Sequence, residues 1–133
     1  MQWDDSSNAG FTTGKPWLAV NPNYVKINAA EQVVREDSVF NYYKKLIELR
    51  HSCDIIVYGH YDLLEPEDPD LFVYTRELDG KKLLVVCNFS EHEREYMPDE
   101  EFREAKVLIR NLDNDKYLDG ILEPYETYVI YKE

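Results

Sequence analysis

Cysteine, basic residues and long apolar runs are all scarce in this chain of 133 residues. Its two cysteines, Cys53 and Cys87, lie in apolar surroundings far apart in the sequence, a pattern typical of buried thiols and not of a disulfide framework. Lysine and arginine number 15 against 27 acidic residues, which gives a net charge of −12. Nucleic acid and anionic membranes are bound through clustered basic residues, so we expect neither as a partner.

Membrane-spanning and secretory patterns are missing as well. No apolar run approaches the roughly 20 residues that cross a bilayer, and the first residues lack the basic and then apolar layout of a signal peptide. We therefore expect a cytoplasmic protein with no membrane partner.

Common cofactor and catalytic motifs are also absent. The sequence has no serine elbow, phosphate-binding loop or glycine-rich dinucleotide turn. His51, His60 and His92 are not at metal-ligand spacing, so we expect no metal site and no cofactor. Asn88-Phe89-Ser90 matches the glycosylation pattern, but it lies at a predicted strand end and we assign it no function.

A hairpin is the strongest structural signal that the sequence does contain. Two runs rich in β-branched, aromatic and aliphatic residues, 71–76 and 82–89, are joined through Asp79-Gly80, and a glycine tolerates the positive φ of a tight primed turn. From Leu83 to Cys87 the second run is apolar on both faces. It is therefore predicted to lie in the middle of a sheet that is covered on both sides.

Further strands follow from short apolar runs separated by turn residues. The last one alternates, with Thr127, Val129 and Tyr131 on one face and Tyr128, Ile130 and Lys132 on the other. The pattern predicts an α+β chain, mainly β, in which an antiparallel β-sandwich follows an N-terminal loop and one or two helices. Besides the two arms of the hairpin, the predicted strands are 55–58, 61–64, 105–110, 116–118 and, as the last one, 126–132.

The N-terminal third is predicted to hold a long loop and two helices. Residues 1–17 lack periodicity, and Trp17 is expected to pack onto a core. Asn28-Ala29-Ala30-Glu31 has the form of a capping box and predicts a helix to about Arg35. Asp37 or Ser38 can cap a second helix, whose apolar stripe runs from Val39 to Arg50.

Several of these segments together carry a family resemblance. The chain resembles the end of the catalytic barrel and the C-terminal domain of oligo-1,6-glucosidases and related α-glucosidases of the α-amylase family, including trehalose-6-phosphate hydrolases. The matching segments are Met1-Gln2-Trp3-Asp4, Asn8-Ala9-Gly10-Phe11-Thr12, Lys15-Pro16-Trp17, Val20-Asn21-Pro22-Asn23-Tyr24, the helix from Asp37, Tyr58-Gly59 and Leu83 to Phe89.

The resemblance implies a C-terminal fragment. Residues 1–53 would be the end of the (β/α)₈ barrel, and residues 54–133 the β-sandwich domain. A complete barrel takes about 250 residues, and in relatives the catalytic carboxylates and a pocket arginine precede the Met-Gln-Trp stretch. The fragment is therefore expected to be inactive and to have the missing barrel as its partner.

For the parent enzyme, the resemblance implies hydrolysis of α-1,6 or α-1,4 glucosidic bonds in short oligosaccharides with retention. It places Gln2, Trp3 and Asp4 beside the glucose pocket. The helix Val39–Arg50 would lose its barrel contacts in the fragment and is expected to dock on the β domain or to self-associate. A carbohydrate-binding sandwich, with exposed tyrosines as a sugar platform, and a trehalose-6-phosphate hydrolase fragment remain the alternatives.

Overall fold

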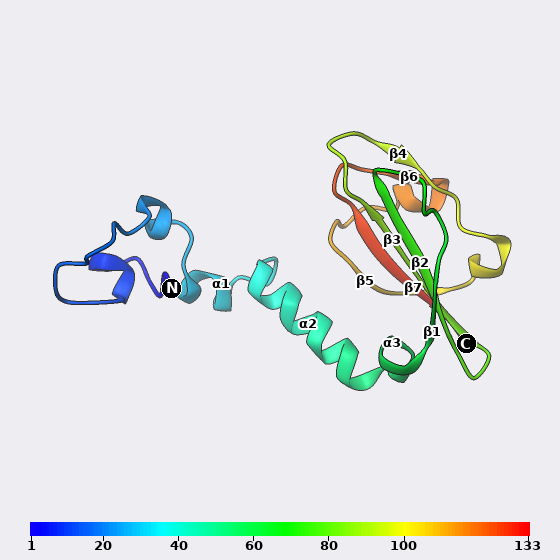
Figure 1. Cartoon of the computed structure of the whole chain (residues 1–133), viewed down its shortest axis with the longest axis horizontal. Coiled ribbons are helices and arrows are strands. Elements are labelled where there is room, and N and C mark those ends of the chain that lie inside the picture. Colours follow the sequence, from blue (N-terminus) through cyan, green and yellow to red (C-terminus); the bar gives the residue numbers. More distant parts are fainter. The chain divides into compact units, whose positions relative to one another are not determined.

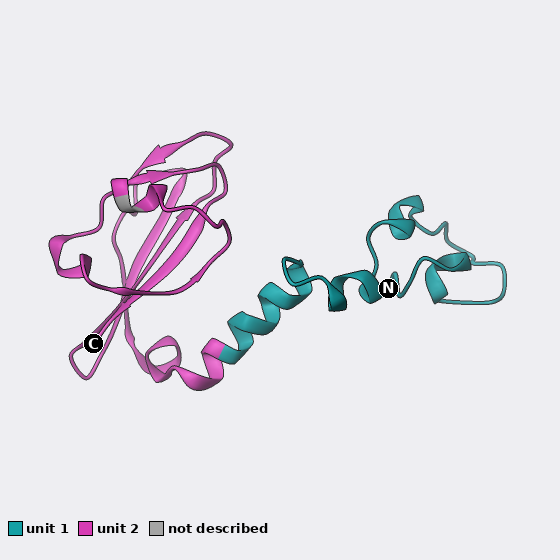
Figure 2. Ribbon diagram, turned by 180° about the vertical axis from the view of Figure 1, so that it is seen from behind, with its two compact units in different colours: residues 1–48 teal, residues 49–133 magenta. Residues whose placement is uncertain are grey.

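The polypeptide divides into two units, Met1–Glu48 (unit 1) and Leu49–Glu133 (unit 2), as coloured in Figure 2. The structure is a computed structural model and describes residues 1–117 and 119–133. The division falls within helix α2. Unit 1 contains the 3-10 helices η1 (Ser7–Gly10) and η2 (Pro22–Val25), helix α1 (Ala29–Val34) and most of helix α2 (Val39–Ser52).

Helix α1 begins at the predicted cap, and each of its first four backbone N–H groups has an acceptor. The Asn28 side chain accepts from the N–H of Glu31 at 2.9 Å, and the Asn28 carbonyl accepts from Gln32. The N–H groups of Ala29 and Ala30 donate to the carbonyls of Gln2 and Trp3, at 2.8 and 2.9 Å. The Gln32 bond is the first regular bond of the helix, and the N–H groups before it have no helical partner. Their bonds to Gln2, Trp3 and the Asn28 side chain therefore tie the N-terminal loop to α1.

Helix α2 is capped by Ser38, one of the two predicted residues. The buried Ser38 hydroxyl accepts from the N–H of Asn41 and donates to the carbonyl of Gln32 at 2.6 Å. The predicted apolar stripe is present but exposed, with Val39 and Tyr43 69% and 63% accessible. Trp17 is 92% accessible, so the prediction that it packs onto a core is wrong for this chain.

Unit 2 is organised around a five-stranded antiparallel sheet, visible in Figure 1, with the strand order β1-β2-β3-β7-β5. The predicted hairpin forms its centre, with Asp79 and Gly80 both at positive φ, 51° and 78°. The five strands are β1 (His60–Leu63), β2 (Leu71–Leu78), β3 (Lys81–Asn88), β5 (Lys106–Arg110) and β7 (Thr127–Lys132).

Strand β3 lies in the middle of the sheet and packs on both faces, as its unbroken apolar run predicts. Leu84 and Val86 belong to one core, and Leu83, Val85 and Cys87 belong to the other. The alternation predicted for the last strand is also present: Tyr128 and Ile130 pack in the first core, Val129 and Tyr131 against the second. Cys53 and Cys87 are free thiols, and Cys87 is buried as predicted, whereas Cys53 is half-buried.

A smaller layer covers the first core and completes the mainly β architecture. Strands β4 (Arg94–Glu95) and β6 (Ile121–Leu122) pair with each other, and η3 (Glu100–Phe102) and η4 (Lys116–Asp119) lie nearby in the chain. Phe102, Tyr117 and Leu122 pack on this face with 8% or less of their surface accessible. The mainly β, α+β prediction is confirmed, with a two-stranded ladder as the second sheet.

Two predicted strands are helical turns in the structure. Residues 55–58 belong to helix α3 (Asp54–Tyr58), which buries Ile55 in the second core and exposes Val57. A strand would place these two side chains on one face, whereas the helix separates them. Lys116 and Tyr117 begin η4, and the third residue of that predicted strand, Leu118, lies outside the described residues.

Candidate functional site

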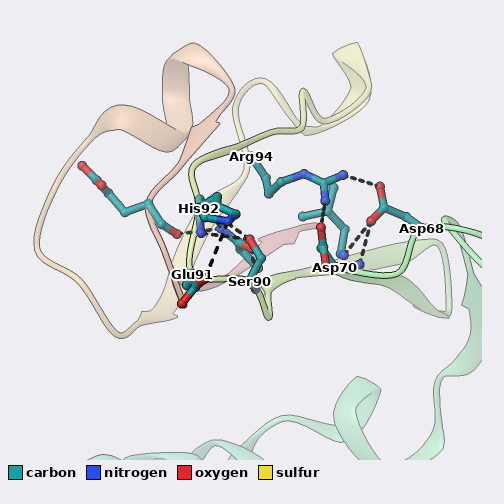
Figure 3. A network of polar contacts seen from close by, with 9 residues as sticks. Asp68, Asp70, Ser90, Glu91, His92 and Arg94 are labelled. Carbon is teal, nitrogen blue, oxygen red and sulfur yellow. Dashed lines mark hydrogen bonds and ion pairs between the residues drawn. The ribbon is translucent and has the colours of Figure 1, made fainter.

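The acidic turn before β2 brings two carboxylates onto one arginine. The Arg94 guanidinium binds Asp68 at 2.7 Å and also binds Asp70 (Figure 3). Both Asp68 and Arg94 are largely covered, with side chains 21% and 27% accessible. The sequence predicts only a solvated charged turn here, because Arg94 is distant in the chain and nothing local indicates the pairing.

The hydrogen bonds to Asp68 are those of a structural cap and not of a catalytic acid. Its carboxylate accepts from the N–H groups of Asp70 and Leu71, each at 2.9 Å. These two bonds, with a smaller contribution from Arg94, lower the pKa of Asp68. A glycosidase acid must hold its proton near neutral pH, which requires a raised pKa. Asp68 therefore fixes the start of β2.

A second group of carboxylates surrounds a hollow of about 250 Å³ beside β1, β2 and β3. Asp62, Glu77 and Glu101 line it, and Glu101 is paired with Lys82 at 2.9 Å. The hydrogen bond from Lys82 lowers the pKa of Glu101 and raises that of Lys82. Glu101 is consequently held as a carboxylate that neutralises lysine, which is a stabilising role.

Asn88 is the centre of a buried polar network at the end of β3. Its amide donates to the carbonyls of His92 and Glu123 at 2.8 and 2.9 Å, and its side-chain oxygen accepts from the Ser90 N–H and hydroxyl. Only 2% of Asn88 is accessible. The Asn88-Phe89-Ser90 match thus has a structural role that sequence analysis missed, and the folded chain presents no free amide there for glycosylation.

The residues predicted to lie near the substrate, Gln2, Trp3 and Asp4, occupy one tightly bonded loop in unit 1. The Gln2 amide donates to the Asn23 side chain and to the Ile27 carbonyl. The N–H of Trp3 donates to the Ala9 carbonyl at 2.9 Å, while its indole side chain stays half exposed. Asp4 accepts from the N–H and the hydroxyl of Ser6, and these bonds lower its pKa.

This loop contains a left-handed turn. Asn8, Ala9 and Gly10 all have positive φ, at 56°, 56° and 67°. The Asn8 amide donates to the carbonyls of Thr12 and Gly14, which fixes the turn from its far side. Left-handed geometry is unfavourable for residues with a Cβ, so such a turn persists only where surrounding bonds define it. The loop is consequently well determined although it lacks regular structure.

Residues 1–117 and 119–133 contain neither a metal-binding cluster nor a membrane-spanning helix. No three side chains of His, Cys, Asp or Glu gather there in a way that could hold a metal ion. Within the same residues, every helix is too short or too polar to cross a bilayer.

Comparison with known proteins finds relatives of this chain among glycoside hydrolases. The α-amylase catalytic-domain model matches residues 1–59. Oligo-1,6-glucosidase from Bacillus cereus is 47% identical over 133 residues, which covers 97% of this chain and 24% of that protein. Along nearly its whole length the chain is thus similar to glycoside hydrolases of the α-amylase family. It spans about a quarter of the length of these relatives.

Other family members agree in sequence and structure. Oligo-1,6-glucosidase from Parageobacillus thermoglucosidasius is 52% identical over 118 residues, covering 87% of this chain and 21% of that protein. The crystal structure of trehalose-6-phosphate hydrolase from Bacillus licheniformis has a TM-score of 0.88 and 42% identity, over 98% of this chain and 24% of that one. The fold of this chain is thus found in enzymes with different names.

Proposed function

We propose that this chain is the C-terminal part of an exo-acting α-glucosidase of the oligo-1,6-glucosidase type. In the longer protein, the reaction would be retaining hydrolysis of α-1,6 or α-1,4 glucosidic bonds in short oligosaccharides. The observation that carries the proposal is the 47% identity to an oligo-1,6-glucosidase along 97% of the chain. We also propose that the protein is cytoplasmic.

The 133 residues themselves would act as a scaffold. Retaining glycosidases need two carboxyl groups about 5 to 5.5 Å apart, one of them protonated at the start of the reaction. Asp68 and Glu101 have lowered pKa values and are bound to cations. The catalytic pair would therefore come from the rest of the polypeptide. In this proposal residues 1–53 complete the barrel and residues 54–133 form the supporting β domain.

The exposed apolar residues of unit 1 support this scaffold role. Trp17, Val34 and Val39 are 92%, 78% and 69% accessible, and exposed apolar surface is where contacts with other protein parts concentrate. We propose that the missing barrel covers them in the longer protein. In the isolated chain, the helix Val39–Arg50, to which Val39 belongs, is the candidate surface for self-association.

We propose that Gln2, Trp3 and Asp4 lie beside the glucose-binding pocket. Their backbone bonds to Ala9, Ala29 and Ala30 fix the loop, and the half-exposed Trp3 ring is free to contact a ligand. Replacing Trp3 with Ala in the longer protein should raise KM for isomaltose without lowering the unfolding temperature. An unchanged KM would remove Trp3 from the substrate pocket.

The direct test compares the longer protein with the 133-residue chain on isomaltose, maltose and trehalose 6-phosphate. We expect the longer protein to hydrolyse isomaltose and the short chain to show no turnover. Preference for trehalose 6-phosphate would favour the alternative suggested by the 41% identity to trehalose-6-phosphate hydrolase from Bacillus subtilis. Turnover by the short chain would refute the scaffold role.

A carbohydrate-binding module is the second candidate function. It is favoured by exposed tyrosines such as Tyr58 and Tyr125, which are 72% and 60% accessible. Titration of the short chain with isomaltose, followed by tryptophan and tyrosine fluorescence, separates the two functions. Saturable binding would support the module, and an unchanged spectrum would support the scaffold.

A further inference from the structure

A two-residue turn of Asp79 and Gly80 joins the central strands β2 and β3. Leu78 pairs with Lys81 across it, so only these two residues form the loop. Both have positive φ, 51° and 78°. A type I′ turn requires positive φ at both central residues, whereas a type II′ turn requires it only at the first. The turn is therefore of type I′.

The peptide group between Asp79 and Gly80 is held by nothing outside the turn. Neither the Gly80 N–H nor the Asp79 carbonyl has a hydrogen-bond partner among the residues that the structure describes. Both residues are exposed, and a methyl group added at Gly80 would meet no atom within 4 Å. Glycine also adopts positive and negative φ about equally well. This peptide group can therefore rotate without breaking a hydrogen bond or meeting a neighbour.

Rotation of the same peptide group converts the type I′ turn into type II′. The two types share a φ of about +60° at the first central residue, and in type II′ its ψ is about −120°. Asp79 already has a φ close to this value. Both types match the twist of paired strands, so β2 and β3 stay paired during the change. At the new ψ the side-chain carboxyl carbon of Asp79 faces the Gly80 nitrogen, since a five-membered ring through these two atoms has about this ψ.

We propose that Asp79 is a modification site, at which the backbone isomerises through a cyclic succinimide. The Gly80 nitrogen attacks the protonated carboxyl carbon of Asp79. A C–N bond forms, a C–O bond breaks, and the hydroxyl leaves with the amide proton as water. Water then adds to the main-chain carbonyl carbon of Asp79 and breaks its bond to the Gly80 nitrogen. The product is isoaspartate, and water is the only co-reactant.

Isomerisation lengthens the turn at the centre of the sheet. The backbone now runs through the former side chain, which inserts one methylene group between Leu78 and Lys81. The main-chain carboxylate of the modified residue becomes free in exchange. Isoaspartate methyltransferases act on such a carboxylate, so the modified turn is a substrate for this class of repair enzyme.

The chain contains a second Asp-Gly pair, which the structure protects. The N–H of Gly120 donates to the Tyr117 carbonyl at 3.1 Å. A methyl group at Gly120 would lie 2.9 Å from Met97 Cε, so this backbone is also packed. Ring closure at Asp119 would have to break the hydrogen bond and displace Met97. The two pairs are equivalent in sequence, whereas the structure favours reaction at Asp79.

The experiment is incubation of the folded 133-residue chain at mildly acidic pH, followed by labelling with an isoaspartate methyltransferase and peptide mapping. Isoaspartate should accumulate several times faster at Asp79 than at Asp119. In concentrated urea the two positions should react at similar rates, because the protecting hydrogen bond of Gly120 is lost. Equal accumulation at the two positions of the folded chain, or none at Asp79, would overturn the proposal.

Two variants keep the turn and change only its chemistry. Asp79→Gly retains a sequence that suits type I′ turns but has no carboxyl group, so labelling of this peptide should disappear. Asp79→Asn also suits the turn, and it should form isoaspartate several times faster at neutral pH, because its amide leaves as ammonia. Labelling that persists in Asp79→Gly would place the modification at another residue and overturn the proposal, as would an Asp79→Asn chain that forms no isoaspartate.

Discussion

The backbone of Gly10 lies directly against the carboxylate of Asp4. A methyl group added at Gly10 would sit 2.7 Å from either carboxylate oxygen, and Gly10 has a φ of +67°. The close approach and the left-handed backbone both require glycine. The Asn-Ala-Gly segment and the Trp-Asp segment are therefore parts of one structure, although they are separate motifs in the sequence.

Replacing Gly10 with Ala should loosen the N-terminal loop. The left-handed backbone alone costs a residue with a Cβ about 1 to 2 kcal/mol, and the contact with Asp4 adds to that. Hydrogen exchange should show lost protection at Trp3 and Asp4, whose N–H groups donate to Ala9. Gly14→Ala is the control, because a methyl there meets only Thr12 Oγ1 at 3.6 Å. Unchanged protection at Trp3 in Gly10→Ala would contradict this account.

The helical form of residues 54–58 can be tested with two alanine substitutions. Ile55 is 3% accessible and Val57 is 37% accessible. Ile55→Ala should lower the free energy of unfolding by about 2 to 4 kcal/mol, and Val57→Ala by much less, as urea denaturation would measure. A strand would give similar losses, since it would place both side chains on one face.

Asn88→Ala should strongly destabilise unit 2. The substitution leaves the Glu123 carbonyl and the Ser90 N–H without their partner, whereas the His92 carbonyl keeps its bond from the Ser90 hydroxyl. Each buried group left unsatisfied costs about 1 to 3 kcal/mol, so urea unfolding should show a loss of at least about 2 kcal/mol. Ser90→Ala removes only a hydroxyl and should cost less. A loss for Asn88→Ala no larger than that for Ser90→Ala would show that the network is unimportant.

Asp68 should make stability depend on pH in the acid range. Its pKa is lowered in the folded state from the usual 3.8, so its contribution is present above that value and is lost as the pH falls through the folded pKa. Asp68→Asn should therefore lower the urea midpoint at pH 6, and the difference from the unsubstituted chain should shrink toward pH 3. Glu67→Gln removes the same charge from an exposed side chain and is the control at pH 6. A constant difference across this range would argue against the hydrogen-bonded carboxylate.

Local chemistry made much of the fold predictable. Asp79-Gly80 predicts a primed turn, and both residues have the required positive φ. Asn28 is a cap because its side chain can reach the Glu31 N–H three residues on, and the structure has this bond. In the last strand, Tyr128 is buried completely, and Val129 packs on the opposite side, as strict alternation requires.

The failures have a different physical origin. Ile55-Ile56-Val57 has the β-branched composition of a strand. The packing of Ile55 on β3 outweighs the preference of these residues for a strand, and the segment is helical. The pairing of β4 with β6, in which Arg94 lies opposite Leu122, was not predicted. It joins distant segments, and a strand of two residues is too short to show alternation in the sequence. The contacts of Arg94 with Asp68 and Asp70 were not predicted either, because these residues are distant in the sequence and meet only in the folded chain.

The position of β7 between β3 and β5 has a consequence for biosynthesis. Strand β5 is translated before β7, yet β7 is its partner in the sheet, since Val107 pairs with Ile130 and Arg110 with Tyr128. On the ribosome, the hairpin of β2 and β3 can close early, while β5 must wait as an unpaired segment until Thr127–Lys132 emerges. A premature stop codon that removed those six residues would therefore cost two strands of the sheet and not one.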